Sequence, residues 1–206
     1  TLAAGANNAF GSGTTVTLNG GNLDATGAFS INNALTLSSD FTFVGTANLT
    51  QNTGAITLGA ANRIIQISGS TVTLGGVIGG NAGIGIAKQG VGTLILSGVN
   101  TYTGGTTINA GTLQIGTGAT TGGISTSSAI VNNGTVIFNR SNTLTQGTDF
   151  NSVISGTGNL IQAGTGTTIL SGSNTYSGIT TISAGTLQMA HASALGSGGN
   201  ITFSGG

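Results

Sequence analysis

The sequence contains no cysteine, proline or tryptophan, and only 3% of its 206 residues are charged. The lack of cysteine excludes a disulfide framework. Three cations balance three carboxylates, so the chain has no net field that would attract nucleic acid or an anionic membrane. No apolar run approaches the ~20 residues of a membrane span. A signal-peptide pattern and an initial methionine are missing too, which is typical of a piece of a longer protein.

The scarcity of titratable groups restricts catalysis. The carboxylates are Asp24, Asp40 and Asp149, and there is no glutamate. A glycosidase needs two carboxylates on either side of the bond it cleaves. In a fold built of stacked coils, adjacent coils could bring Asp24 and Asp40 together. We instead favour the interpretation that both are turn or strand-end residues whose carboxylates accept nearby backbone N–H groups. The cations Arg63 and Arg140, like Lys88, lack the acidic clusters that accompany a lyase site.

Other possible sites also favour structural interpretations. His191 is the only histidine, and without a Gly-x-Ser-x-Gly motif we expect it in a solvated turn. The chain has too few ligands for zinc. Gly90-Val91-Gly92 and Gly164-Thr165-Gly166 lack the third glycine and the helix of a phosphate loop. Tyr102 and Tyr176 recur in an Asn-Thr-Tyr turn, which favours corner packing over stacking on sugars. We therefore predict no catalytic, cofactor-binding or metal-binding residues, no cofactor, and no enzymatic activity.

The chain is instead rich in glycine, with 40 residues, and 37% of it is apolar. Apolar residues occur in apolar–x–apolar triplets such as Val16-Thr17-Leu18, Leu35-Thr36-Leu37 and Ile56-Thr57-Leu58. Alternate side chains of a strand point to opposite faces, so each triplet directs two apolar groups inward. Glycine and asparagine lie between the triplets and tolerate the positive φ of tight corners. This pattern indicates an all-β chain.

A long internal repeat favours a solenoid. Residues 88–116 and 162–190 are identical at 19 of 29 positions. Within each copy the strands lie about 20 residues apart, which suggests coils stacked ~4.8 Å apart in parallel register. We predict a right-handed parallel β-helix of roughly nine to ten coils, forming one continuous segment over residues 1–206. An antiparallel sandwich suits the short strands but does not require near-copies. Low-complexity disorder is disfavoured by the ordered apolar pattern.

The two copies resemble the autotransporter passenger-associated strand repeat. In the first copy the matching residues are Lys88, Gly90, Gly92, Thr93, Leu94, Leu96, Ser97, Gly98, Asn100, Thr101, Tyr102, Gly104, Thr106, Thr107, Ala110, Gly111, Thr112 and Leu113. The second copy departs from the pattern at Gln162 and Thr168. The resemblance implies a passenger of a large outer-membrane autotransporter, folded as a right-handed parallel β-helix outside the cell. It implies no single activity.

These observations predict a non-enzymatic structural segment of an extracellular or cell-surface protein, acting as a stalk, adhesive spacer or fibre-forming unit. The alternative is a ligand-binding face for carbohydrate or ice on outward threonines. Expected partners are a host or environmental surface, or further copies joined end to end or laterally. End-to-end association is suggested because residues 1–21 and 186–206 match in phase. We expect neither nucleic-acid binding nor membrane insertion by this segment.

The proposed register makes specific predictions about side chains. Leu94, Leu96, Leu113, Ile115, Leu187 and Met189 should point inward, while Gln114 and Gln188 point outward. Ile95 and Ile169 should also face outward. Their recurrence at one motif position suggests a lateral contact along one face of the helix.

Overall fold

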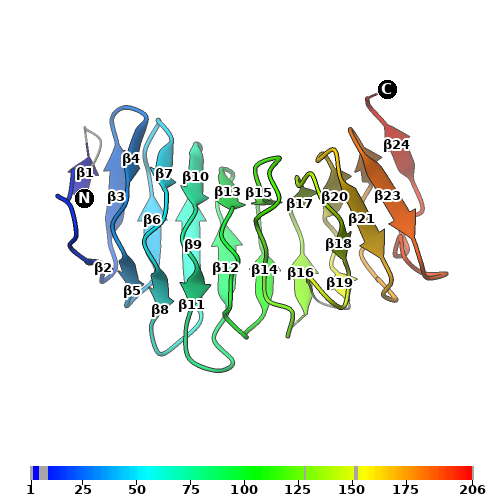
Figure 1. Ribbon diagram of the computed structural model, residues 1–206, viewed down its shortest axis with the longest axis horizontal. Helices are drawn as coiled ribbons and strands as arrows, with labels where there is room; N and C mark the ends of the chain where they lie inside the picture. Colours follow the sequence, from blue (N-terminus) through cyan, green and yellow to red (C-terminus); the bar gives the residue numbers. More distant parts are fainter. Residues whose placement is uncertain (1, 5–8, 128, 151–152, 206) are drawn as a thin grey trace.

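The computed structural model describes residues 2–4, 9–127, 129–150 and 153–205. These residues form a parallel β-helix of about eight turns, with its coils arranged side by side in chain order from β1 to β24 (Figure 1). The predicted fold class is therefore confirmed. Within the described ranges no helix is long and apolar enough to cross a membrane. The segment 1–21, which matched 186–206 in phase, lies partly outside these ranges.

Each coil visits three faces in a fixed order, and all strand pairs are parallel. The first face is an eight-stranded sheet of β1 (Leu2–Ala4), β3 (Asn22–Ala25), β6 (Phe41–Phe43), β9 (Arg63–Ile67), β12 (Ile86–Gln89), β14 (Thr106–Ile108), β16 (Ile130–Asn132) and β19 (Ile154–Ser155). The second face is a nine-stranded sheet of β4 (Phe29–Ile31), β7 (Leu49–Gln51), β10 (Thr71–Leu74), β13 (Thr93–Leu96), β15 (Thr112–Ile115), β17 (Thr135–Phe138), β20 (Asn159–Gln162), β22 (Thr180–Ile182) and β24 (Ile201–Phe203).

The third face is divided between two shorter sheets. One contains β2 (Val16–Leu18), β5 (Leu35–Leu37), β8 (Ile56–Leu58) and β11 (Ile78–Gly79). The other contains β18 (Leu144–Thr145), β21 (Thr167–Leu170) and β23 (Thr186–Met189), which take the same place in the coil order. Between the two sheets the chain still bonds from coil to coil, since the N–H groups of Thr101 and Tyr102 donate to the carbonyl of Ile78.

The number of turns is lower than predicted because the coils vary in length. Leu94 pairs with Leu113, whereas Phe43 pairs with Ile67, so the coil between the second pair contains more of the chain. The strands themselves stay short, so the added residues lie in the corners. The estimate of nine to ten coils assumed that every coil has the length found within the repeats, and it was too high.

The core consists of inward side chains stacked from coil to coil. On the second face, one such stack contains Leu49, Val72, Leu94, Leu113, Val136 and Leu160. All six are buried, and each contributes roughly 1.5–3 kcal/mol through removal of apolar surface from water. The inward positions of Leu94, Leu96, Leu113 and Ile115 are thus confirmed. Gln114, between two buried neighbours, is only half-buried.

At the end of the second repeat Gln188 is exposed as predicted, but the two residues predicted to point inward are not fully buried. Met189 is 56% exposed, Leu187 is half-buried against the core, and Gln188 is exposed. In the parallel register Met189 lies beside fully buried Leu170 and shares its inward direction. Among the described strands, however, none follows β23 in its sheet. An inward direction alone therefore does not bury Met189.

The two recurrent isoleucines do not form one row. Both Ile95 and Ile169 are half-buried at outward positions. Ile95 lies in β13 on the second face, whereas Ile169 lies in β21 on the third face. A lateral contact along a single face would therefore involve only one of them.

A matched pair of substitutions tests the register. Leu113→Asp places a charge in the aliphatic stack and should cost more than ~4 kcal/mol, enough to abolish cooperative unfolding of the neighbouring coils. Gln114→Asp introduces the same group one position along, on the outward side, and should cost less than about 1 kcal/mol. Urea unfolding monitored by circular dichroism measures both. Equal destabilisation by the two variants would contradict the inward–outward alternation.

Candidate functional site: polar groups of the corners and outward faces

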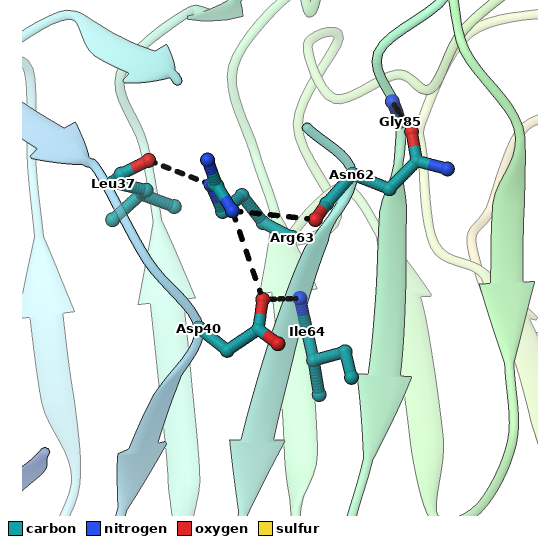
Figure 2. A network of polar contacts seen from close by, with 6 residues as sticks. All are labelled: Leu37, Asp40, Asn62, Arg63, Ile64 and Gly85. Atoms are coloured by element: carbon teal, nitrogen blue, oxygen red, sulfur yellow. Dashed lines mark hydrogen bonds and ion pairs between the residues drawn. The ribbon is translucent and has the colours of Figure 1, made fainter. Parts of the chain in front are cut away.

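Arg63 and Asp40 tie neighbouring coils together near a corner (Figure 2). Arg63 begins β9, and its Nε donates a 2.8 Å hydrogen bond to the carbonyl of Leu37. Its Nη1 lies 4.0 Å from Oδ1 of Asp40, and the same oxygen accepts the N–H of Ile64 at 2.8 Å. Asp40 thus accepts a backbone N–H, as predicted, and its carboxylate also partners a nearly buried guanidinium.

Asp149 and His191 make local contacts, and Asp24 lies apart from Asp40. Oδ2 of Asp149 accepts the N–H of Thr145 at 2.7 Å, as the sequence predicted. The register that pairs Asn22 with Thr42 places Asp24 beside Val44, four positions beyond Asp40. These two carboxylates therefore do not form a pair across a substrate bond. His191 lies in an exposed turn, where its Nδ1 accepts the N–H of Ser193 at 3.0 Å.

Arg140 holds the long corner excursion between β15 and β16. Its Nη1 donates to the carbonyl of Gly122 at 2.8 Å and its Nη2 to the carbonyl of Thr120 at 2.6 Å. Its Nε donates to Oδ1 of Asn142 at 2.9 Å. Burial lowers the pKa of Arg140, and the nearby carboxylate of Asp149 opposes that shift. The guanidinium therefore acts as a clamp for the backbone.

Lys88 is an inward-facing lysine in the first repeat. It is 1% exposed, and its Nζ donates to the carbonyls of Gln89, Gly90 and Ala110 at 2.8, 2.7 and 3.3 Å. Three donors on one ammonium meet three carbonyl oxygens at the corner. Burial lowers the pKa of Lys88 from 10.5 to about 8. The motif's lysine thus satisfies backbone groups inside the coil.

In the second repeat, two hydrogen-bonded side chains take the place of the lysine at the equivalent corner. Gln162 replaces the lysine, and its Nε2 donates to the carbonyls of Gly164 and Gly166 at 2.8 and 3.3 Å. Unlike an ammonium, a carboxamide also has an oxygen that needs a donor. Thr168, which replaces the motif's first leucine, supplies it through Oγ1 at 2.6 Å. The two departures noted in the sequence therefore compensate each other.

The two tyrosines pack inside the corners, as predicted. Tyr102 and Tyr176 are 1% and 0% exposed, so neither offers a ring to a sugar. Each hydroxyl lies 2.7 Å from Oγ1 of the threonine four residues later, Thr106 or Thr180. Burial raises the pKa of Tyr102 to about 12 and raises that of Tyr176 as well.

An asparagine two residues before each tyrosine joins the coils on either side. Oδ1 of Asn100 accepts the N–H of Ile78 at 2.8 Å, while its Nδ2 donates to the carbonyl of Gly123 at 2.7 Å. Asn174 does the same between Ile154 and Ala194, at 2.8 and 2.7 Å. Sequence reasoning missed this role, although the Asn-Thr-Tyr motif shared by the two copies marked the position.

The outward side of the second face is rich in threonine. The strand register aligns Thr71, Thr93, Thr112 and Thr135 in one half-buried row. Two positions along each strand, the neighbouring row contains Thr50, Thr73, Ile95, Gln114, Ile137, Ile161, Thr181 and Thr202. The continuous threonine row was missed because each triplet was considered alone. It is an uncharged surface that offers hydroxyl and methyl groups.

A shallow depression lies on the outward side of the first face. It has a volume of about 260 Å³, and its lining includes Asp40, Thr42, Gln66 and Gln89. The lining has one carboxylate and no second acid or histidine beside it. Within the described ranges there is also no cluster of three or more histidine, aspartate or glutamate side chains that could hold a metal ion. The arrangement offers hydrogen-bonding groups and no pair for acid–base catalysis.

Comparisons with known proteins agree with the motif. Residues 86–115 and 160–189 match the passenger-associated-transport-repeat family. An alignment of 135 positions, which covers 60% of this chain, is 42% identical to the "Adhesin BmaC autotransporter" of Brucella suis biovar 1 (strain 1330). The match spans only 4% of the length of that adhesin. No solved structure matches the chain. The resemblance to autotransporter passengers is confirmed, and with it an extracellular or cell-surface location.

Lys88 should make stability depend on pH in a range where few other groups titrate. Between about pH 8 and 10.5 the folded chain binds fewer protons at Lys88 than the unfolded chain, so stability rises with pH. We expect a gain of about 2 kcal/mol from pH 7.5 to 9.5. Above pH 10 the trend should reverse, because the raised tyrosine pKa values favour ionisation in the unfolded chain.

Urea unfolding at a series of pH values measures this dependence. The control is Lys88→Gln combined with Leu94→Thr, which transfers the pair of the second repeat into the first. It removes the titrating group while keeping the corner hydrogen-bonded, so its stability should stay flat from pH 7.5 to 9.5. A flat profile for the unmodified chain would show that Lys88 is not buried as a cation.

The coupled pair of the second repeat should behave non-additively. Thr168→Leu leaves the Gln162 oxygen buried without a donor and should cost about 2 kcal/mol. Adding Gln162→Lys restores the chemistry of the first repeat and should recover more than half of that loss. A double-mutant cycle from urea midpoints measures the coupling. Additive effects of the two substitutions would disprove it.

Proposed function

We propose that this chain, which carries two passenger-associated transport repeats, is a rigid, non-enzymatic stalk within a cell-surface passenger of the adhesin type. The main support is how its few charged groups are used. Arg63, Arg140 and Lys88 all donate to backbone carbonyls, while Asp40 and Asp149 accept backbone N–H groups. Groups committed to the scaffold in this way are not poised for chemistry on a substrate.

The architecture suits a spacer. About eight coils at ~4.8 Å each give a rod roughly 40 Å long. Hydrogen bonds run from coil to coil on all three faces and continue through corners without strands, so bending would break several at once. The related adhesin is far longer than this chain, which is consistent with a segment that contributes length. With only 3% charged residues, little repulsion separates copies, so we include lateral or end-to-end self-association in this proposal.

A second candidate function is a ligand-binding surface on the second face. The row formed by Thr71, Thr93, Thr112 and Thr135 favours it, because regularly spaced hydroxyl and methyl groups suit carbohydrate or ice. Ile95 and Gln114 interrupt the adjacent row, which leaves that row without a continuous line of hydroxyls. We therefore prefer the stalk.

Two sets of substitutions separate these functions in bacteria displaying the passenger that contains this chain. Thr93→Lys, Thr112→Lys and Thr135→Lys together alter the outward row without touching the core. A stalk predicts cell adhesion within about twofold of the unmodified level, and a binding face predicts a loss of tenfold or more. Leu113→Asp, which disrupts the core, should reduce adhesion in either case and serves as the positive control. Adhesion lost in the threonine variant at unchanged surface display would overturn the stalk proposal.

A further inference from the structure

The two repeats rest on equivalent strands of the preceding coil. In the first repeat, the N–H of Thr101 donates to the carbonyl of Ile78, which lies in β11, at 2.8 Å. In the second, the N–H of Thr175 donates to the carbonyl of Ile154, which lies in β19, at 2.9 Å. The side-chain oxygens of Asn100 and Asn174 accept the N–H groups of the same two isoleucines. We call the strand that each repeat rests on its floor, β11 for the first repeat and β19 for the second. The two floors make the same contacts.

Each repeat also pairs its own strands. In the first, β12 pairs with β14 and β13 with β15, and in the second, β20 pairs with β22 and β21 with β23. The partners agree position for position, since Lys88 lies beside Ile108 and its replacement Gln162 lies beside Ile182. The register between the strands of a repeat is thus the same in both copies.

One glycine in each repeat shows how closely the corner geometry is reproduced. Gly111 and Gly185 occupy the same motif position, with φ of 67° and 63°. A Cβ on Gly111 would collide with the carbonyl oxygens of Gly90 and Gly92, and a Cβ on Gly185 would collide with the equivalent carbonyls of the second repeat. Only glycine fits both the backbone conformation and the space.

The two repeats nevertheless start on different faces. The first begins with β12 on the first face and β13 on the second, whereas the second begins with β20 on the second face and β21 on the third. Its floor moves in the same sense, from β11 on the third face to β19 on the first. From the start of the first copy to the start of the second, the chain passes β14, β16 and β19 on the first face and then advances one face further. One period, the stretch of chain from the start of one copy to the start of the next, therefore corresponds to three and a third coils.

We infer that the repeat is an exchangeable cassette that works from any starting face of the β-helix. Its strand pairs, corner hydrogen bonds and buried polar pair are internal or bind a floor that makes the same contacts in both copies, so either floor can carry either repeat. Gain or loss of one period then changes the rod by about 16 Å and turns all later coils by one third of a turn. The period sets the direction in which later surfaces point as well as their distance. This inference goes beyond the stalk proposal and does not depend on it.

A deletion of one period tests the cassette. Removal of residues 88–161 joins Ala87 to Gln162, removes β19 and puts the second repeat in the place of the first, on the floor formed by β11. The expected product is a folded β-helix with one cooperative urea transition. The matched control removes residues 60–133, a segment of equal length, and joins Gly59 after the third face to Gly134 before the second. It skips the first face and should lose cooperative folding.

Spin-label distances report the turn, and the lack of native cysteine allows labels at chosen sites. In the full chain Thr73 and Thr181 lie in one outward row of the second face. In the deletion, Thr181 should occupy the place of Thr107 on the first face. The pair Thr73→Cys/Thr181→Cys in the deletion should therefore reproduce the distances of Thr73→Cys/Thr107→Cys in the full chain. Distances like those of Thr73→Cys/Gln114→Cys would mean that no turn occurs and would overturn the inference.

If the shortened chain does not fold, the reciprocal insertion shows whether the cause is its reduced length or a repeat that is tied to one face. Duplication of residues 88–161 adds one period and keeps all original coils. The longer chain should unfold cooperatively, and small-angle scattering should detect a rod longer by about 16 Å. If neither the deletion nor the insertion folds, the repeat is tied to its original face and the cassette is wrong.

Discussion

The fold depends on one requirement, that each backbone N–H and carbonyl along a coil meets a partner in the coil above or below. Strands meet it through parallel pairing, but corners leave the groups out of phase. Here side chains take over. Asn48, Asn62, Asn133 and Asn159 each accept an N–H from the next coil with their amide oxygens. Asparagine thus extends the ladder of inter-coil hydrogen bonds through the corners.

The same requirement explains the rare charged and buried polar residues. A buried ammonium is tolerated where several carbonyls converge, as at Lys88, and the half-buried guanidinium of Arg140 likewise meets two carbonyls. Gln162 donates to carbonyls of the equivalent corner without a charge. Its own amide oxygen needs a donor, and the hydroxyl of Thr168 supplies one. In a chain with so few charges, the basic residues have structural positions.

Sequence reasoning reached the fold because the signals for it are local. The alternation in triplets such as Leu35-Thr36-Leu37 follows directly from strand geometry, and the near-copies required a repeating architecture. Coil number was less accessible, since corner length varies without changing the strands. The face of the β-helix on which Ile95 and Ile169 lie depends on how many coils one period contains. That number is known only from the strand register. The partnership of Gln162 with Thr168 was visible as two departures in one copy, but its chemistry required knowing that both point inward.

The placement of the three basic residues also affects how the folded chain meets proteases outside the cell. Enzymes of trypsin specificity cleave after lysine or arginine and need that side chain and its flanking backbone in an extended, accessible segment. Arg63 is 8% exposed and Lys88 is 1% exposed, both within strands paired on two sides, and the guanidinium of Arg140 is bound to loop carbonyls. Cleavage at Arg63 or Lys88 requires local unfolding of the paired strands, and cleavage at Arg140 requires release of its guanidinium from the loop carbonyls. The groups that complete the corners thereby also conceal the cleavage sites.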